Sequence, residues 1–76
     1  MKKRKIYLCI KNTFWFKEGD LLIQANRPKY VGSESHWLIG REKFMKEKTI
    51  DEILSSKERK DGTAVFKGDV EFIGYL

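Results

Sequence analysis

The chain reads Phe-Lys-Glu-Gly-Asp-Leu-Leu-Ile at residues 16–23, and a near-repeat, Phe-Lys-Gly-Asp-Val-Glu-Phe-Ile, follows at residues 66–73. In both segments an aromatic residue and a lysine lead into Gly-Asp, and an apolar run comes next. Glycine accepts the positive φ of a tight turn, and aspartate can hydrogen-bond to the nearby backbone. The apolar and aromatic residues that follow favour a pleated, half-buried strand. The pair therefore predicts a small, turn-rich, mainly β domain.

The length of 76 residues fits one domain with a thin core. A chain of this size buries only about 60% of the surface that its unfolded form exposes. Hydrophobic residues make up 41% of the chain and aromatic residues 13%, which is too rich for a disordered protein. Because large rings bury the most surface per residue, we expect them to supply much of the core. The rings expected there are Phe14, Trp15, Phe16, Tyr30, Trp37, Phe44, Phe66 and Phe72.

The net charge of +5 is concentrated at the N-terminus. Lys2, Lys3, Arg4 and Lys5 carry four of the 16 positive charges, and the remaining chain holds 12 basic against 11 acidic residues. We therefore predict a basic tail over residues 1–5 and a single near-neutral β-rich domain over residues 6–76. Such a tail can contact phosphates or acidic partners, although a short lysine run also aids solubility alone.

No feature of the sequence predicts membrane insertion or disulfide bonding. No segment reaches the roughly 20 apolar residues that span a bilayer. The apolar run after the basic tail covers only residues 6–10, which is shorter than the ~7–15 residues of a signal peptide. The single cysteine, Cys9, cannot form an internal disulfide. We expect a cytoplasmic protein without a membrane partner.

Alternating and apolar segments predict most of the strands. Residues 5–11 alternate, with Tyr7 and Cys9 on one face and three aliphatic residues on the other. Further strands are expected at residues 20–26, 29–31 and 36–39.

The C-terminal half is expected to hold one short helix and a final hairpin. Thr49 and Glu52 have the spacing of a capping box, which predicts a helix near residues 49–59. The apolar runs at residues 63–67 and 70–76 are expected to pair through the second Gly-Asp turn. The fold class is thus mainly β (a β-rich α+β domain), with five to six short antiparallel strands.

This pattern resembles a Src-homology-3-like small β-barrel. The resemblance rests on Phe-Lys-Glu-Gly-Asp-Leu-Leu at 16–22 and Phe-Lys-Gly-Asp-Val at 66–70. The early strand at 6–10, and Trp-Leu-Ile at 37–39 leading to Phe44, also resemble short accessory proteins encoded by bacteriophages. The helix at 49–59 is longer than the single turn that often precedes the last barrel strand. A strongly bent open sheet with one helix packed across it is therefore the alternative.

Catalytic and metal-binding chemistry is not predicted. Cys9 lies within a strand and is expected to be a small buried residue, and His36 is the only histidine. One cysteine and one histidine cannot complete a structural zinc site, which needs about four ligands. Each carboxylate has a structural role at a turn or helix end, and no glycine-rich phosphate loop is present. We expect no catalytic residue, no cofactor and no metal.

Exposed aromatic residues offer a binding function instead. Phe14, Trp15 and Phe16 are consecutive, so they cannot all point inward from an extended segment. Trp15 either faces outward as an anchor or folds back over an open end of the barrel. The residues considered for partner binding are Trp15, Phe14, Lys17, Arg27, Lys29, Tyr30 and Trp37. Those considered for phosphate contact are Lys2, Lys3, Arg4 and Lys5.

Two functions are compatible with these features. The first is a non-enzymatic protein-binding module, implied by the phage resemblance to be an accessory protein or inhibitor that engages a host protein in the host cytoplasm. The alternative is a nucleic-acid-binding small β-barrel that uses the basic tail and exposed aromatics. Homodimerisation through an edge strand at residues 70–76 is a third possibility for partners.

Overall fold

The computed structural model describes residues 3–43 and 62–76. These residues form five strands: β1 (Lys5–Cys9), β2 (Leu21–Gln24), β3 (Ser35–Gly40), β4 (Thr63–Phe66) and β5 (Val70–Tyr75). A 3₁₀ turn, η1 (Lys67–Asp69), joins the last two strands, and the chain is helical at 41–43. The predicted mainly β class is confirmed. The helix predicted near 49–59 and the ring of Phe44 lie outside the described residues.

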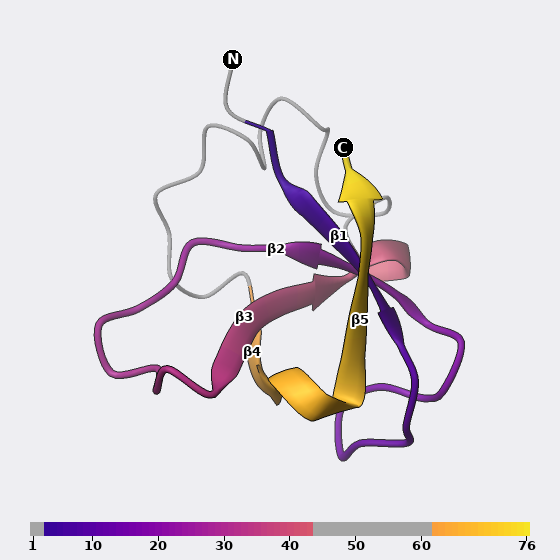
Figure 1. The fold of residues 1–76 in the computed structure, drawn as a ribbon, viewed down its shortest axis with the longest axis horizontal. Coiled ribbons are helices and arrows are strands. Elements are labelled where there is room, and N and C mark those ends of the chain that lie inside the picture. Colours follow the sequence, from indigo (N-terminus) through magenta and orange to yellow (C-terminus); the bar gives the residue numbers. More distant parts are fainter. Residues whose placement is uncertain (1–2, 44–61) are drawn as a thin grey trace.

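The strands form one antiparallel sheet in the order β4-β3-β2-β1-β5 (Figure 1). The described sheet is not closed, and β4 and β5 are its two edges. The predicted C-terminal hairpin is wrong, because β4 pairs with β3 and β5 pairs with β1. The short turn η1 thus carries the chain from one edge of the sheet to the other.

The two Gly-Asp segments differ in conformation, and both hydrogen-bond to the end of β1. Gly19 has φ +95°, whereas Gly68 lies inside η1 without a positive φ. The Asp20 backbone carbonyl accepts a hydrogen bond from the Cys9 amide at 2.9 Å, and the Asp69 backbone carbonyl accepts one from the Ile10 amide at 2.9 Å. The near-repeat therefore starts the two strands, β2 and β5, that flank β1, and each copy fixes the end of β1.

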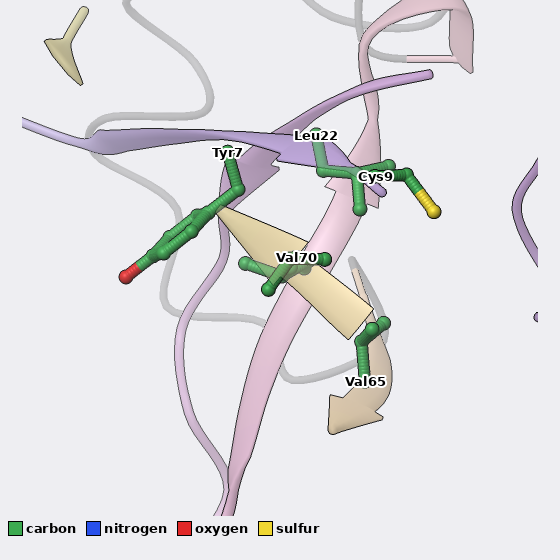
Figure 2. Packing of buried hydrophobic residues seen from close by; sticks show 6 residues of the cluster. Tyr7, Cys9, Leu22, Val65 and Val70 are labelled. Carbon is green, nitrogen blue, oxygen red and sulfur yellow. The ribbon is translucent and has the colours of Figure 1, made fainter. Parts of the chain in front are cut away.

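The core is aliphatic rather than aromatic. Its main cluster consists of Tyr7, Cys9, Leu22, Leu38, Val65 and Val70, with half-buried Phe16 packed against it. Figure 2 shows Val65 of β4 and Val70 of β5, from the two edge strands, in the same cluster, while the Tyr7 hydroxyl and the Cys9 sulfur point to opposite sides of it. The cluster joins side chains from all five strands of the sheet.

The prediction of an aromatic core is wrong for most rings. Phe14, Trp15, Tyr30, Phe66 and Phe72 are all exposed. Tyr7, which was not among the predicted rings, is the one aromatic residue that is buried in the described part of the chain.

A second apolar cluster occupies the other face of β2 and β3. Ile23, Ala25 and Ile39 are buried there, with Ile6 and Trp37 packed against them. Alternation along a strand sends successive side chains to opposite faces, so both faces of these central strands bury apolar residues. A Cβ atom at Gly62 would overlap the Trp37 indole, so the absence of a side chain at position 62 makes room for this ring.

Residues 29–31 do not form the predicted strand. They lie in a turn in which the Val31 amide donates to the Pro28 carbonyl at 3.2 Å. The Arg27 guanidinium donates to the carbonyls of Val31 and Gly32, which holds the turn from outside.

Among the residues described, no helix is long and apolar enough to cross a membrane.

Candidate functional site

The segment between β1 and β2 is organised around Thr13. The amides of Trp15 and Phe16 donate to Thr13 Oγ1 at 3.2 and 2.8 Å. The Thr13 hydroxyl and amide both donate to the Phe16 carbonyl, at 3.1 and 2.7 Å. Threonine favours such local turns because its short side chain reaches the neighbouring backbone. One threonine therefore fixes the path of the backbone that carries the aromatic run.

The following turn is fixed in the same way. The Lys17 amide donates to Asp20 Oδ2 at 2.9 Å, and the Asp20 amide donates back to the Lys17 carbonyl at 3.0 Å. The Glu18 amide donates to Asn12 Oδ1 at 2.9 Å, and the Gly19 amide donates to the Cys9 carbonyl at 2.8 Å. The hydrogen bonds tie both ends of the loop to the end of β1.

This backbone presents two large rings to solvent. Phe14 is 89% exposed and Trp15 is 63% exposed. The two rings meet edge to face, with centroids 4.7 Å apart and planes at 81°. Trp15 thus adopts the outward orientation, while Phe16 turns inward onto the core cluster. We call the pair Phe14 and Trp15 the loop anchor.

A pocket of about 580 Å³ lies beside the loop anchor. Phe16 reaches close to Gly40, where an added Cβ would meet the ring at 3.1 Å. The volume falls in the range of small-ligand sites. Among the described residues, the lining carries both signs of charge, from Asp20 and Glu42 and from Arg41 and Lys43, and no Cys, His, Ser or Tyr. The lining residues are Trp15, Phe16, Gly19, Asp20, Leu21, Gly40, Arg41, Glu42 and Lys43.

The other predicted partner residues form a second group. Tyr30 is exposed and meets Trp37 edge to face at 6.3 Å. Trp37 is half-buried and packs on the second apolar cluster, so its ring is mainly structural. Its Nε1–H has no hydrogen-bond partner among the described residues. Lys17, Arg27 and Lys29 are exposed, and Arg27 serves the turn described above.

The basic residues at the N-terminus do not all lie on a tail. Lys5 is the first residue of β1, and the Arg4 side chain is buried with its Nη1 donating to Asn26 Oδ1 at 3.1 Å. The Leu76 amide donates to the Arg4 carbonyl at 2.8 Å, which continues the pairing of the two ends of the chain. Lys3 is exposed, and Lys2 lies outside the described residues. Arg4 and Lys5 are thus part of the folded domain.

Cys9 lacks the features of a reactive thiol. Its side chain is fully buried, and its Sγ donates to the Lys11 carbonyl at 3.0 Å. Burial raises the pKa of the Cys9 thiol, and the carboxylates of Asp20, Asp69 and Glu18 raise it further. A nucleophilic cysteine needs a lowered pKa, so this environment opposes thiolate formation. Within residues 3–43 and 62–76, no three metal-ligating side chains lie together.

One cluster was missed at the sequence level. The His36 ring packs on Tyr7 with centroids 4.5 Å apart, Tyr7 meets Phe72 at 5.9 Å, and Phe72 meets Tyr75 at 5.2 Å. Lys5 Nζ lies 5.9 Å from the centre of the Phe72 ring. This cluster was missed because the predicted hairpin of residues 63–76 paired β5 with β4, whereas β5 pairs with β1.

No protein-family model matches this chain, and comparisons with curated proteins and with solved structures find no match.

Proposed function

We propose that this protein is a non-enzymatic binding module that engages a partner protein through the loop anchor. The observation that carries the proposal is the exposure of Phe14 and Trp15 on a backbone held by Thr13. Tryptophan and other large rings dominate the affinity of protein interfaces. A loop that is already ordered loses little conformational freedom on binding, so more of the contact free energy appears as affinity.

The charges around the loop anchor favour a protein over a polyanion. The pocket beside Trp15 places Asp20 and Glu42 among its lining together with Arg41 and Lys43. Mixed charges suit the polar rim of a protein interface, where they set orientation and specificity. A phosphate backbone would meet repulsion from both carboxylates.

The proposed fold family and the kind of partner depend on the resemblances described for the sequence. The strand order, with a 3₁₀ turn between β4 and β5, supports an expected likeness to small Src-homology-3-like barrels. The likeness to bacteriophage accessory proteins adds the prediction that the partner is a host protein and that binding inhibits it.

An affinity pulldown with the immobilised full-length protein tests the proposal. Cell lysate is applied with and without nuclease, and retained proteins are identified by mass spectrometry. We expect one stoichiometric protein that survives nuclease and is lost when Phe14→Ala and Trp15→Ala are combined. Phe66→Ala is the matched control, because Phe66 is an equally exposed ring on β4. The absence of any retained protein that survives nuclease, or nuclease-resistant retention that is equal for all variants, would overturn the proposal.

A further inference from the structure

Four rings form a continuous row across β3, β1 and β5. The row runs from His36 through Tyr7 and Phe72 to Tyr75, and each neighbouring pair of centroids is between 4.5 and 5.9 Å apart. Tyr7 and Phe72 face each other directly in the register of β1 and β5. We call these four side chains the aromatic row.

The row passes from the core to the surface. Tyr7 is buried, whereas Phe72 is 47% and Tyr75 57% exposed. The planes of Phe72 and Tyr75 stand at 72° to each other. Buried Tyr7 packs against Phe72, and Phe72 packs against Tyr75, so two rings remain exposed to solvent in a defined arrangement.

Positive charge surrounds the row. Lys5 lies over Phe72 and faces Tyr75 in the strand register. Burial lowers the pKa of His36, and the nearby Lys67, Lys5 and Arg27 lower it further. Three basic side chains of the described residues thus act on this histidine. Glu71 is next to Phe72 in the strand, so alternation directs its side chain to the opposite face.

We propose that the exposed end of the aromatic row, with Lys5 and Lys67, binds single-stranded nucleic acid. Bases stack on exposed aromatic side chains irrespective of sequence, and neighbouring cations follow the phosphate backbone. Phe72 and Tyr75 provide the rings, and the lysines provide the phosphate contacts.

Other occupants fit this surface less well. A cationic ligand would be repelled by Lys5, Lys67 and Arg27. A second copy of the chain carries the same net charge of +5 and would offer these lysines no excess of negative charge. An acidic peptide would satisfy the lysines but would leave the rings without a flat partner. A single-stranded polynucleotide uses both the rings and the charges.

The exposed ring of Tyr75 is separate from the loop anchor. Tyr75 lies at the end of β5 and pairs with Lys5 at the start of β1, whereas the loop that carries Phe14 and Trp15 leaves β1 from its other end, after Cys9. The two proposals therefore fail independently. A substitution at Trp15 leaves the aromatic row intact, and a substitution at Tyr75 leaves the loop intact.

Fluorescence anisotropy with a labelled oligothymidylate of about 12 nucleotides, a length within the usual range for single-strand-binding OB folds, tests the proposal. We expect saturable binding by the full-length protein at low salt. Tyr75→Ala is expected to weaken it about tenfold, and Tyr75→Phe, which keeps the ring, is expected to leave it unchanged. Trp15→Ala and Phe66→Ala are the matched controls and should bind as the unaltered protein does.

The salt dependence separates phosphate contacts from stacking. For single strands the slope of log K against log salt changes by about 0.7 for each phosphate contact. Lys67→Gln is expected to reduce the slope by about that amount, whereas Tyr75→Ala should leave the slope unchanged while lowering the affinity. Thermal melts of each variant confirm that the fold is retained.

The pKa of the single histidine, His36, gives a further test. Nucleic acid bound only by the distant N-terminal lysines would leave this pKa unchanged. The imidazole signal of His36 can be followed by NMR, and a phosphate bound nearby should raise its pKa. Three results would overturn the proposal: no binding at low salt, equal binding by Tyr75→Ala, or full competition by polyglutamate with no dependence on the ring. Dimerisation detected by light scattering and abolished by Tyr75→Ala would assign the surface to a second copy instead.

Discussion

The inside and the outside of this domain are built from different kinds of side chain. The main core cluster contains leucine, valine and cysteine with a single ring, Tyr7, whereas most of the other described rings are exposed. A small domain needs apolar burial for stability, so large rings left in solvent forgo a stabilising contribution. The contrast separates residues that maintain the fold from exposed rings, to which our proposals assign partner binding. Each prediction below separates these two roles.

The largest effect is expected in the core. Leu38 is fully buried, so Leu38→Ala should lower the free energy of unfolding by about 2–5 kcal/mol. Since a domain of this size has a total stability on the order of 5 kcal/mol, much of the variant should be unfolded. Urea denaturation gives the free energy, and alkylation of buried Cys9 reports the unfolded fraction independently. Phe66→Ala should change the stability by much less, and an equal loss from both would remove the contrast between core and surface.

The next effect concerns the backbone beneath the loop anchor. Gly19 has φ +95° and no atom close to an added Cβ, so Gly19→Ala should cost about 1–2 kcal/mol of stability through backbone strain alone. Gly68 is the matched control, because it has the same open surroundings without a positive φ. Gly68→Ala should be neutral or slightly stabilising. Thermal denaturation of both variants measures the difference, and equal melting temperatures would show that the two Gly-Asp segments have the same backbone requirement.

A smaller effect on stability, with a clear effect on binding, is expected at Thr13. Thr13→Val removes the hydroxyl that accepts hydrogen bonds from the Trp15 and Phe16 amides. The ordered conformation of the loop should lose about 1 kcal/mol of stability as a result. Partner affinity should fall by roughly tenfold, because the rings must then be ordered on binding. Thr13→Ser retains the hydroxyl and should restore the affinity, as isothermal titration with the captured partner would show. Identical affinities for the valine and serine variants would mean that the loop needs no pre-organisation.

The smallest effect lies at the border between core and surface. Burial lowers the pKa of His36, with Tyr7 packed against the ring and Lys67, Lys5 and Arg27 nearby. The unfolded chain therefore binds a proton more readily than the folded protein. The contribution of His36 to stability is complete above about pH 6.5, the ordinary value for histidine, and is lost as the pH falls through the lower folded value. Denaturation from pH 7.5 to pH 5 should show a steeper loss for the unaltered protein than for His36→Gln, and parallel curves would contradict this assignment.

Local patterns in the sequence predicted the positions of most strands but not their partners. The alternation at residues 5–11 and the apolar run at 20–26 correspond to β1 and β2. The same Gly-Asp pair precedes both β2 and β5, yet Gly68 lies in a 3₁₀ turn that directs the chain to the opposite edge of the sheet. The position of β5 depends on its pairing with β1. These strands are distant in sequence, so no local pattern predicts that they pair.

The candidate site was predictable only in part. Three consecutive aromatics required one ring to face outward, and Trp15 does so. The burial of Arg4 depends on Asn26, far along the chain, so composition alone placed it on a tail. The aromatic row could not be found without the pairing of β1 with β5, because its members come from three separate segments.

The central claim is that Trp15 contributes to binding and not to stability. The direct test measures the free energy of unfolding and the affinity for the captured partner in parallel for Trp15→Ala and Phe66→Ala. We predict that both variants unfold within about 0.5 kcal/mol of the unaltered protein, as is usual for surface sites, and that only Trp15→Ala loses about 2 kcal/mol of binding free energy. A large loss of stability with unchanged affinity for Trp15→Ala would contradict the account.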